Sequence, residues 1–289
     1  MTQQAAPPWA AGVRPWLAAA GAALIVAALA VEGLARRYVV AESAQFVVLA
    51  MAAPALIVLG APWRLLRLSR APASPDPASP ARASPAPASP APASPDPASG
   101  AAPLDRLAAA RQRQSSFLRA GGYLLAFICA GVAWRLPPVM DALARHPVLV
   151  LPELVTLLAA GTALWLELVH SPPLAPRLPK PQRAAVAALA MWSAWAVAYV
   201  LGLSNHAVFH GYDPAGGALS PVADQQITVA LVWAVSACCF VPVIFVALLT
   251  WLSGNGDPDE ELQRLARDGR QHPVVRGWGR PARGSRADR

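Results

Sequence analysis

The chain is 289 residues long, 55% of its residues are hydrophobic, only 14% are charged, and its mean hydropathy is +0.39. Soluble domains carry about 25% charged residues, so this composition excludes an ordinary soluble domain and indicates a membrane protein. The net charge of +8 does not indicate a nucleic-acid-binding protein, because the basic residues lie beside apolar segments and do not alternate with aromatic residues on one face.

The sequence gives no sign of a disulfide framework or of an enzyme. The cysteines Cys129, Cys238 and Cys239 all lie inside apolar segments, and the adjacent pair is more typical of small packing residues than of a metal site. There is no HExxH motif, no phosphate-binding loop and no paired nucleophile and base, so we expect no enzymatic activity. The first apolar segment lacks a cleavage site, which predicts a retained membrane span and not a secretory signal.

Apolar segments long enough to cross a membrane recur along the chain, and they predict an all-α, polytopic transmembrane helix bundle of about six spans. The expected spans cover residues 15–34, 42–66, 120–134, 148–169, 184–203 and 227–252. They divide the chain into a disordered N-terminal tail (1–14), two helices (15–69), a linker (70–103), an amphipathic lead-in with four helices (104–252) and a charged tail (253–289).

The linker is a low-complexity tract in which the unit ASPxP repeats between residues 73 and 99. Proline at this density prevents both helix formation and strand pairing, so we expect a disordered, extended, solvated spacer on the cytoplasmic side. A platform for a proline-recognising partner is the alternative. The lead-in that follows, LDRLAAARQRQSSFLR, has helical spacing and basic residues, which predicts a helix along the membrane surface.

Basic residues predict the orientation of the bundle. All of the 24 lysines and arginines except Arg36, Arg37, Arg135 and Arg145 lie in the tails or in the loops on the same side as the tails. Because cytoplasmic segments carry the excess of basic residues, both termini are expected in the cytoplasm of a multi-pass plasma (inner) membrane protein.

This topology places polar groups of three spans at one depth. The second, fourth and sixth spans all begin on the outer side, and their first turns carry Glu42 with Gln45, Glu153, and Asp224 with Gln225. Ionisable groups inside a membrane need a partner or a function, so these residues predict an outer polar cluster facing the bundle interior. Helix capping is the alternative, above all for Asp224.

Three segments resemble the CtaG-type cytochrome c oxidase assembly factors. They are AQFVVLAMAAPALIVLGAPWRLL, with its Leu-Gly-Ala-Pro turn, WRLPPVMDALARHPVLVLPELVTLLAAGTALW, and SPVADQQITVALVW, with its Asp-Gln pair. The resemblance implies a polytopic membrane protein that acts in maturation of the copper-bearing subunit of the oxidase. It also implies cytochrome c oxidase subunits or other membrane proteins, together with the lipid bilayer, as partners.

The chain departs from that family pattern at its histidines. Positions where the family has histidines at the outer ends of two spans hold Glu42 and Phe46, and Val150 and Leu154, while Arg135 stands where a further histidine is expected. An apolar side chain cannot bind copper, and copper prefers imidazole and sulfur to carboxylate. The family also has seven spans where we expect six.

A residual copper site is predicted in the outer loop before the sixth span. His206 and His210 are four residues apart, a spacing that would bring both imidazoles to one metal on a helical turn, and Asp213 is near. Two exposed histidines in a polar loop are the alternative.

The leading hypothesis is therefore a membrane assembly factor for cytochrome c oxidase, with copper as the cofactor that the resemblance implies and no other expected. A metal-free scaffold or interaction subunit is the second hypothesis. A small-solute or proton transporter using Glu42, Glu153 and Asp224 is the third.

Overall fold

The computed structural model describes residues 8–64, 109–111, 115–171, 174, 176–212 and 219–253. The whole expected linker (70–103) and the outer parts of both tails lie outside the described residues, so the predictions made for them stay predictions. Within the described residues the chain is helical and has no strand beyond one isolated bridge between Ser171 and Leu174. The all-α prediction is confirmed.

The helices follow the predicted spans closely. Their bounds are α1 (Pro8–Ala30), α2 (Glu32–Ala35), α3 (Val39–Val47), η1 (Val48–Ala52), α4 (Ala53–Gly60), η2 (Pro62–Arg64), α6 (Ser116–Trp134), α7 (Pro137–Arg145), η3 (Pro147–Leu149), α8 (Val150–Leu168), α9 (Lys180–Gly202) and α10 (Pro221–Leu252). Five helical stretches are long and apolar enough to cross a membrane: 39–60, 116–134, 147–168, 180–202 and 221–252. The first expected span corresponds to α1, whose apolar part is Arg14–Ala30, and the chain turns at Val31 before α2 begins.

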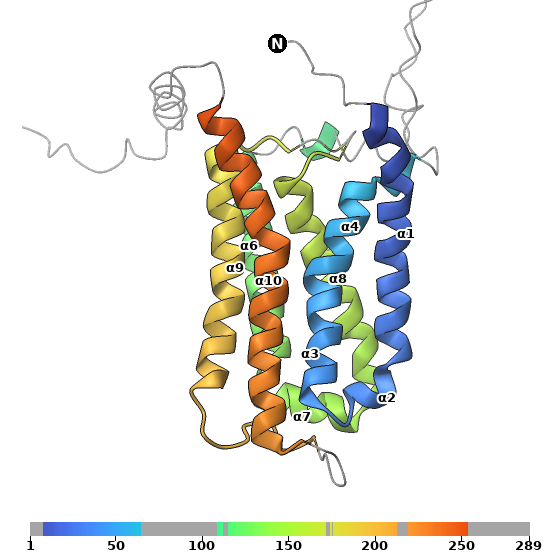
Figure 1. The fold of residues 1–289 in the computed structure, drawn as a ribbon, viewed down its shortest axis with the longest axis vertical. Coiled ribbons are helices and arrows are strands. Elements are labelled where there is room, and N and C mark those ends of the chain that lie inside the picture. The colour runs from blue at the N-terminus through green and yellow to red at the C-terminus, as the bar shows by residue number, and fades with distance from the viewer. Residues whose placement is uncertain are drawn as a thin grey trace, which may run out of the picture.

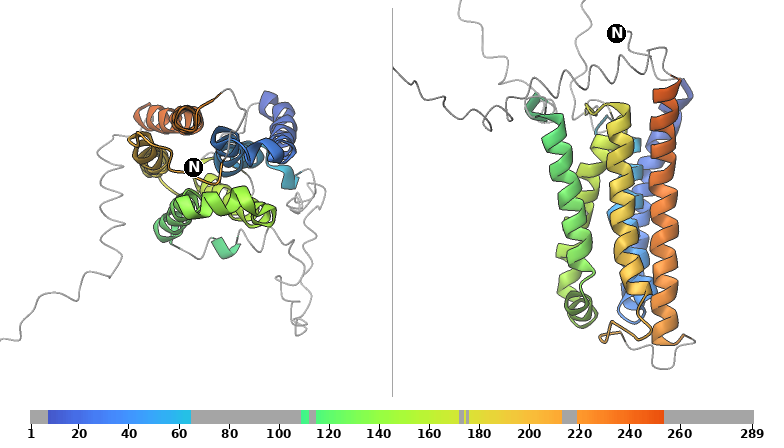
Figure 2. Two further views of the ribbon diagram at one scale, coloured as in Figure 1. Left: turned by 90° about the horizontal axis from the view of Figure 1, so that it is seen from below. Right: turned by 90° about the vertical axis from the view of Figure 1, so that its left-hand side faces the viewer.

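The bundle consists of three antiparallel helix pairs. Figure 2 shows α1 beside the continuous stretch α3–η1–α4, α6 beside α8, and α9 beside α10. α1 begins and α10 ends at one end of the bundle, which we call the terminal end (Figure 1). The opposite end holds α2, α7 and the segment between α9 and α10, and we call it the loop end. Both described chain ends thus lie at one end, as an even number of crossings requires.

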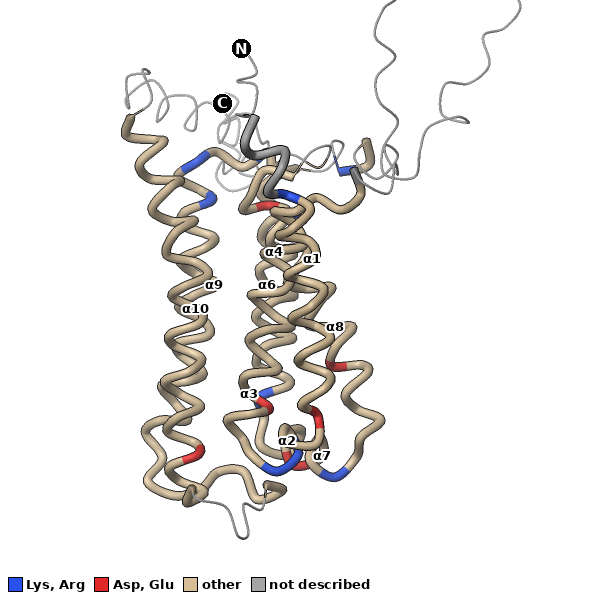
Figure 3. The backbone as a smooth tube through the Cα atoms, turned by 45° about the vertical axis from the view of Figure 1, so that its right-hand side comes forward, with Lys and Arg blue, Asp and Glu red and all other residues tan. Residues whose placement is uncertain are grey.

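Charged residues divide between the two ends of the bundle. Figure 3 shows most of the described acidic residues at the loop end, and it shows lysine and arginine at both ends. Lys180 at the terminal end donates to the carbonyl of Thr250 (2.9 Å), and Arg183 donates to that of Leu178 (2.9 Å). These cations therefore satisfy carbonyl groups near helix and loop ends that have no partner within a helix.

Small residues and aromatic rings pack the pairs. A Cβ on Gly60 would lie less than 3.0 Å from Ala18, and one on Gly21 would lie 2.9 Å from Ile57, so α1 and α4 approach as closely as glycine allows. In the α9–α10 pair, the rings of Trp195 and Trp233 stack with centroids 5.1 Å apart. Close packing of this kind drives helix association in lipid, where apolar burial from water is absent.

The second span is not a regular α-helix. Pro54 has no N–H to donate to the Ala50 carbonyl four residues before it, and the backbone passes through the π-turn η1 next to that position. The Ala50 carbonyl faces Gly161 of α8, where a Cβ would lie within 3.0 Å of the carbonyl oxygen. Proline in one span is thus matched by glycine in its neighbour.

Candidate functional site

The polar residues predicted at one depth all lie inside the bundle at the loop end, but they divide into three separate groups. The side chains of Glu42, Gln45, Glu153, Asp224 and Gln225 are at most 2% exposed. All five side chains therefore lie in the interior of the bundle. Their partners differ, and the function assigned to them remains a prediction.

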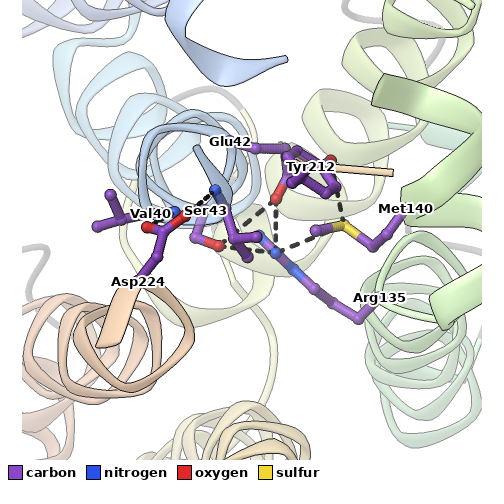
Figure 4. Close-up of polar contacts among 8 residues, drawn as sticks. Val40, Glu42, Ser43, Arg135, Met140, Tyr212 and Asp224 are labelled. Carbon is purple, nitrogen blue, oxygen red and sulfur yellow. Dashed lines mark hydrogen bonds and ion pairs between the residues drawn. The ribbon is translucent and has the colours of Figure 1, made fainter. Parts of the chain in front are cut away.

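The first group centres on an ion pair between α3 and the residue that follows α6. Nη1 of Arg135 donates to Oε2 of Glu42 (2.6 Å) and to Oγ of Ser43 (2.8 Å) (Figure 4). The guanidinium also lies over the ring of Phe46, with Cζ 4.1 Å from the ring centroid. Both partners are almost completely buried, so this is an ion pair inside a membrane bundle.

Glu153 of α8 brings a second carboxyl group to the same place. Its side chain interacts directly with that of Glu42 and is 1% exposed. Oε1 of each carboxyl receives no hydrogen bond from the described N–H and O–H groups. A carboxylate can only accept, so a hydrogen bond between the two groups requires one shared proton. The predicted convergence of Glu42 and Glu153 is therefore found, with Arg135 as a partner that the prediction lacked.

Two further residues close the first group on the side of α7. Nη1 of Arg135 contacts Sδ of Met140 at 3.7 Å, and the hydroxyl of Tyr212 contacts the same sulfur at 3.9 Å. Burial raises the pKa of the Tyr212 phenol, and the neighbouring carboxyl of Glu42 raises it further. Tyr212 therefore stays a neutral hydrogen-bond donor at physiological pH. We call Glu42, Ser43, Arg135, Met140, Glu153 and Tyr212 the loop-end cluster.

Gln45 of α3 belongs to a second group, whose other members, Glu32 and Arg36, lie in α2 and directly after it. Its Nε2 donates to Oε2 of Glu32 (3.1 Å), and Nε of Arg36 donates to Oε1 of the same carboxyl (2.9 Å). Gln45 lies one turn from Glu42 along the helix, but among the described residues its side chain bonds to Glu32 and not to the loop-end cluster. It fastens α2 to α3 instead.

Asp224 and Gln225 form the third group, which connects α10 to two other segments. Asp224 accepts hydrogen bonds from the backbone N–H groups of Val39 (2.7 Å) and Val40 (3.0 Å), the first residues of α3. Gln225 accepts from the N–H of Val208 (3.0 Å) and donates to the carbonyl of Leu201 (2.9 Å). The Asp-Gln pair thus holds the start of α3 and the end of α9 against α10.

Capping, the alternative considered for Asp224, is found in a different form. The cap of its own helix is Ser220, whose Oγ accepts from the N–H of Ala223 (3.2 Å). Asp224 caps α3 instead, and it is 185 residues from Val39, where that helix begins. A carboxylate at a helix start satisfies unpaired N–H groups and interacts favourably with the helix dipole.

Asp224→Ala is expected to lower the free energy of unfolding by about 2 kcal/mol, because it removes a buried carboxylate that accepts from two backbone N–H groups, whereas Ser220→Ala removes one exposed acceptor and is expected to cost about 0.5–1 kcal/mol. Ser220→Ala is the matched control, because Ser220 caps α10 only and is exposed. Equilibrium unfolding of both variants in mixed micelles compares the two effects. An Asp224→Ala loss no larger than that of Ser220→Ala would contradict the bridging role.

The two histidines predicted to hold copper lie in the segment between α9 and α10. His206 and His210 are both exposed, and residues 206–210 are not helical. The buried Phe209 lies between them in the chain and packs with Tyr212. The helical turn that would bring their imidazoles to one metal is therefore not formed, and copper binding by this pair stays a prediction.

The donor set of the loop-end cluster fits a metal poorly. The described residues contain no group of three or more His, Cys, Asp or Glu side chains placed to hold a metal ion. The carboxylate of Glu42, the hydroxyl of Ser43 and the thioether of Met140 instead surround Nη1 of Arg135. The guanidinium of Arg135, which is always charged, thus occupies the oxygen and sulfur atoms that could otherwise bind a metal. The cluster also contains no imidazole or thiolate, the ligands that copper prefers.

A buried ionic cluster at the terminal end was not predicted. The Glu167 carboxyl is completely buried and accepts from Nε (2.7 Å) and Nη2 (2.9 Å) of Arg119, and Arg111 binds the same carboxyl. The signal was present in the sequence, because an acid in an apolar span needs a partner and a basic residue at the same end of a neighbouring span can supply it. The contact holds residues 109–111 against α8.

A family model described as "Cytochrome c oxidase caa3 assembly factor (Caa3_CtaG)" matches residues 2–253. No individual curated protein and no solved structure gives a significant match. The matched residues include every helix described above, and they cover well over half of the chain.

Proposed function

Because the chain belongs to the family of cytochrome c oxidase caa3 assembly factors, we propose that it acts in the plasma membrane as a non-enzymatic factor for maturation of the copper-bearing oxidase subunit. The family match over residues 2–253 is the observation that carries this proposal. In this proposal both termini are cytoplasmic and the loop end faces outward, as the distribution of basic residues favours. Reporter fusions at the C-terminus test that orientation, and an external reporter would reject it.

In our proposal the bundle supports maturation by binding the client subunit and holds no copper of its own. The poor fit of the loop-end cluster to a metal supports this part, because Arg135 already supplies a cation to Glu42. Partner binding would then involve the loop end, where α7 and the segment between α9 and α10 are exposed in part. This version unites the assembly-factor hypothesis with the hypothesis of a metal-free interaction protein.

Deletion of the gene in its host is expected to lower oxidase activity and the amount of assembled copper-bearing subunit, and reintroduction of the wild-type gene is expected to restore both. Purified protein in detergent is expected to bind no stoichiometric Cu(I). A double variant, His206→Ala with His210→Ala, is the matched control. It is expected to restore the oxidase as well as wild type does.

The outcomes separate the parts of the proposal. Unchanged oxidase in the deletion strain would reject the function in assembly. Stoichiometric Cu(I) binding that the double histidine variant loses would reject the metal-free version and favour copper delivery from the outer loop. The transporter alternative would be favoured by solute- or proton-dependent flux in vesicles that requires Glu42 and Glu153, which are buried together.

A further inference from the structure

An apolar cavity lies where the three helix pairs meet. The space between the second span, α6, α9 and α10 amounts to about 540 Å³ and is partly open to the outside of the bundle. Its walls include Phe46, Phe127, Val197 and Val232. Val132, which is 39% exposed, also lines the cavity, so the cavity reaches the outer surface of the bundle, where the lipid lies.

Two residues that line this cavity carry buried polar atoms without partners. Arg135 and Thr228 both line it, and they are 5% and 1% exposed. Among the described residues, Nε and Nη2 of Arg135 and Oγ1 of Thr228 have no hydrogen-bond partner. A buried donor without an acceptor costs about 1–3 kcal/mol, and more when it is charged, so these atoms indicate a bound group that supplies an acceptor.

The charge of the site favours a neutral acceptor. Glu42 already offsets the charge of Arg135 through Nη1, and Glu153 adds a second carboxyl group beside them. An anion bound to Nε and Nη2 would therefore be placed close to two carboxyl groups. A carbonyl oxygen accepts hydrogen bonds from a guanidinium and a hydroxyl without adding charge.

The shape of the cavity favours a chain. The lining residues run from Phe127 on α6 to Arg135 just after it, and from Ser193 to Leu201 on α9, each over about 12 Å at 1.5 Å per residue. The donors lie toward the loop end, because Arg135 directly follows the last residue of α6. A chain that enters from the loop-end leaflet would thus have its polar part near Arg135 and its apolar part along the helices. Water would find too few polar partners along the apolar part.

We propose that this cavity binds one acyl chain of a membrane phospholipid, whose ester carbonyl accepts hydrogen bonds from Arg135 and Thr228. The lipid completes the packing between the α9–α10 pair and the remainder of the bundle. It also satisfies the donors of Arg135 that the loop-end cluster leaves free. The site is independent of the function proposed above, because it requires neither copper nor an oxidase subunit.

The test uses the full-length protein in phospholipid vesicles that contain a phosphatidylethanolamine with a photoreactive diazirine on one acyl chain. After irradiation, mass spectrometry identifies the labelled residues, and native mass spectrometry gives the mass of any retained lipid. Labelling is expected at cavity-lining residues of α6, α9 and α10. Competition by unlabelled phosphatidylethanolamine and by unlabelled fatty acid distinguishes the two sources of an acyl chain.

Two variants change the site in different ways. Gly131→Leu places a side chain in the cavity and is expected to abolish labelling there. Thr228→Val keeps the shape but removes the hydroxyl, and is expected to reduce occupancy up to about tenfold, as loss of one buried hydrogen bond does. Gly121→Leu is the control, because Gly121 is an exposed residue of the same helix with no atom near its missing Cβ.

Labelling that is equal in wild type, Gly131→Leu and Gly121→Leu would overturn the proposal. So would a retained species with the mass of a fatty acid, or competition by fatty acid and not by phospholipid. Thr228→Val keeps the test valid if Gly131→Leu fails to fold, because the substitution is nearly isosteric. Arg135 is not substituted in this test, because its removal would also leave the buried Glu42 without its ion-pair partner.

Discussion

Arg135→Met is expected to lower the free energy of unfolding by about 3–5 kcal/mol, the usual cost of leaving a buried charge without its partner. Glu42 is 1% exposed and its ion-pair partner is Nη1 of Arg135 at 2.6 Å. Methionine has a similar length and no charge, so the loss reflects the missing guanidinium more than a missing volume. Equilibrium unfolding in mixed micelles measures the difference.

Two further variants show whether the ion pair is the cause. Arg145→Met is the matched control, because Arg145 is exposed and donates to the carbonyl of Asp141 on its own helix (2.9 Å). Its effect is expected to stay below about 0.5 kcal/mol. Combining Glu42→Gln with Arg135→Met should recover part of the stability, because the unpaired carboxylate is then absent. A double variant less stable than Arg135→Met would contradict the ion-pair explanation.

The fold could be predicted from the sequence because each span carries its own signal. Apolar length and flanking basic residues predicted the helices, and their bounds differ from the structure by a few residues at most positions. The main difference is at the first span, where the apolar run continues past Ala30 but the helix does not. A break of this kind depends on tertiary contacts of α2, such as that of Glu32 with Gln45, and not on local hydropathy.

The candidate site was predictable in part. Burial of Glu42 and Glu153 at one depth follows from counting spans, but rotation of each helix about its axis does not. Rotation decides that Asp224 meets the start of α3 and that Gln45 meets Glu32. Arg135 was recognised as a replacement for a histidine, and its contact with Glu42 emerges only when α3 and α6 are placed side by side. The same holds for Arg119 and Glu167.

The second span and α8 approach each other closely at one glycine, Gly161, and substitution of this glycine is expected to lower stability strongly. Gly161→Ala is expected to lower the free energy of unfolding by about 2–3 kcal/mol, since overpacking against rigid atoms forces the backbones apart. A Cβ at this position would lie within 3.0 Å of the Ala50 carbonyl oxygen and 2.9 Å from Cγ of Pro54. Neither atom can move away by a side-chain rotation, because one belongs to the backbone and the other to a ring.

Gly121→Ala is the matched control for Gly161→Ala. No atom lies within 4 Å of the Cβ that alanine would add at Gly121, so the helix propensity of alanine is the main effect there, and stability is expected to stay constant or to rise by up to about 1 kcal/mol. The same substitution therefore has opposite signs at the two positions. Pro54→Ala tests whether the irregular backbone of the second span creates this close contact. The substitution restores an N–H that can bond to the Ala50 carbonyl, and a regular helix at this point would change the contact with Gly161. If Gly161→Ala proved as stable as wild type in mixed micelles, the two spans would not be in contact at these atoms.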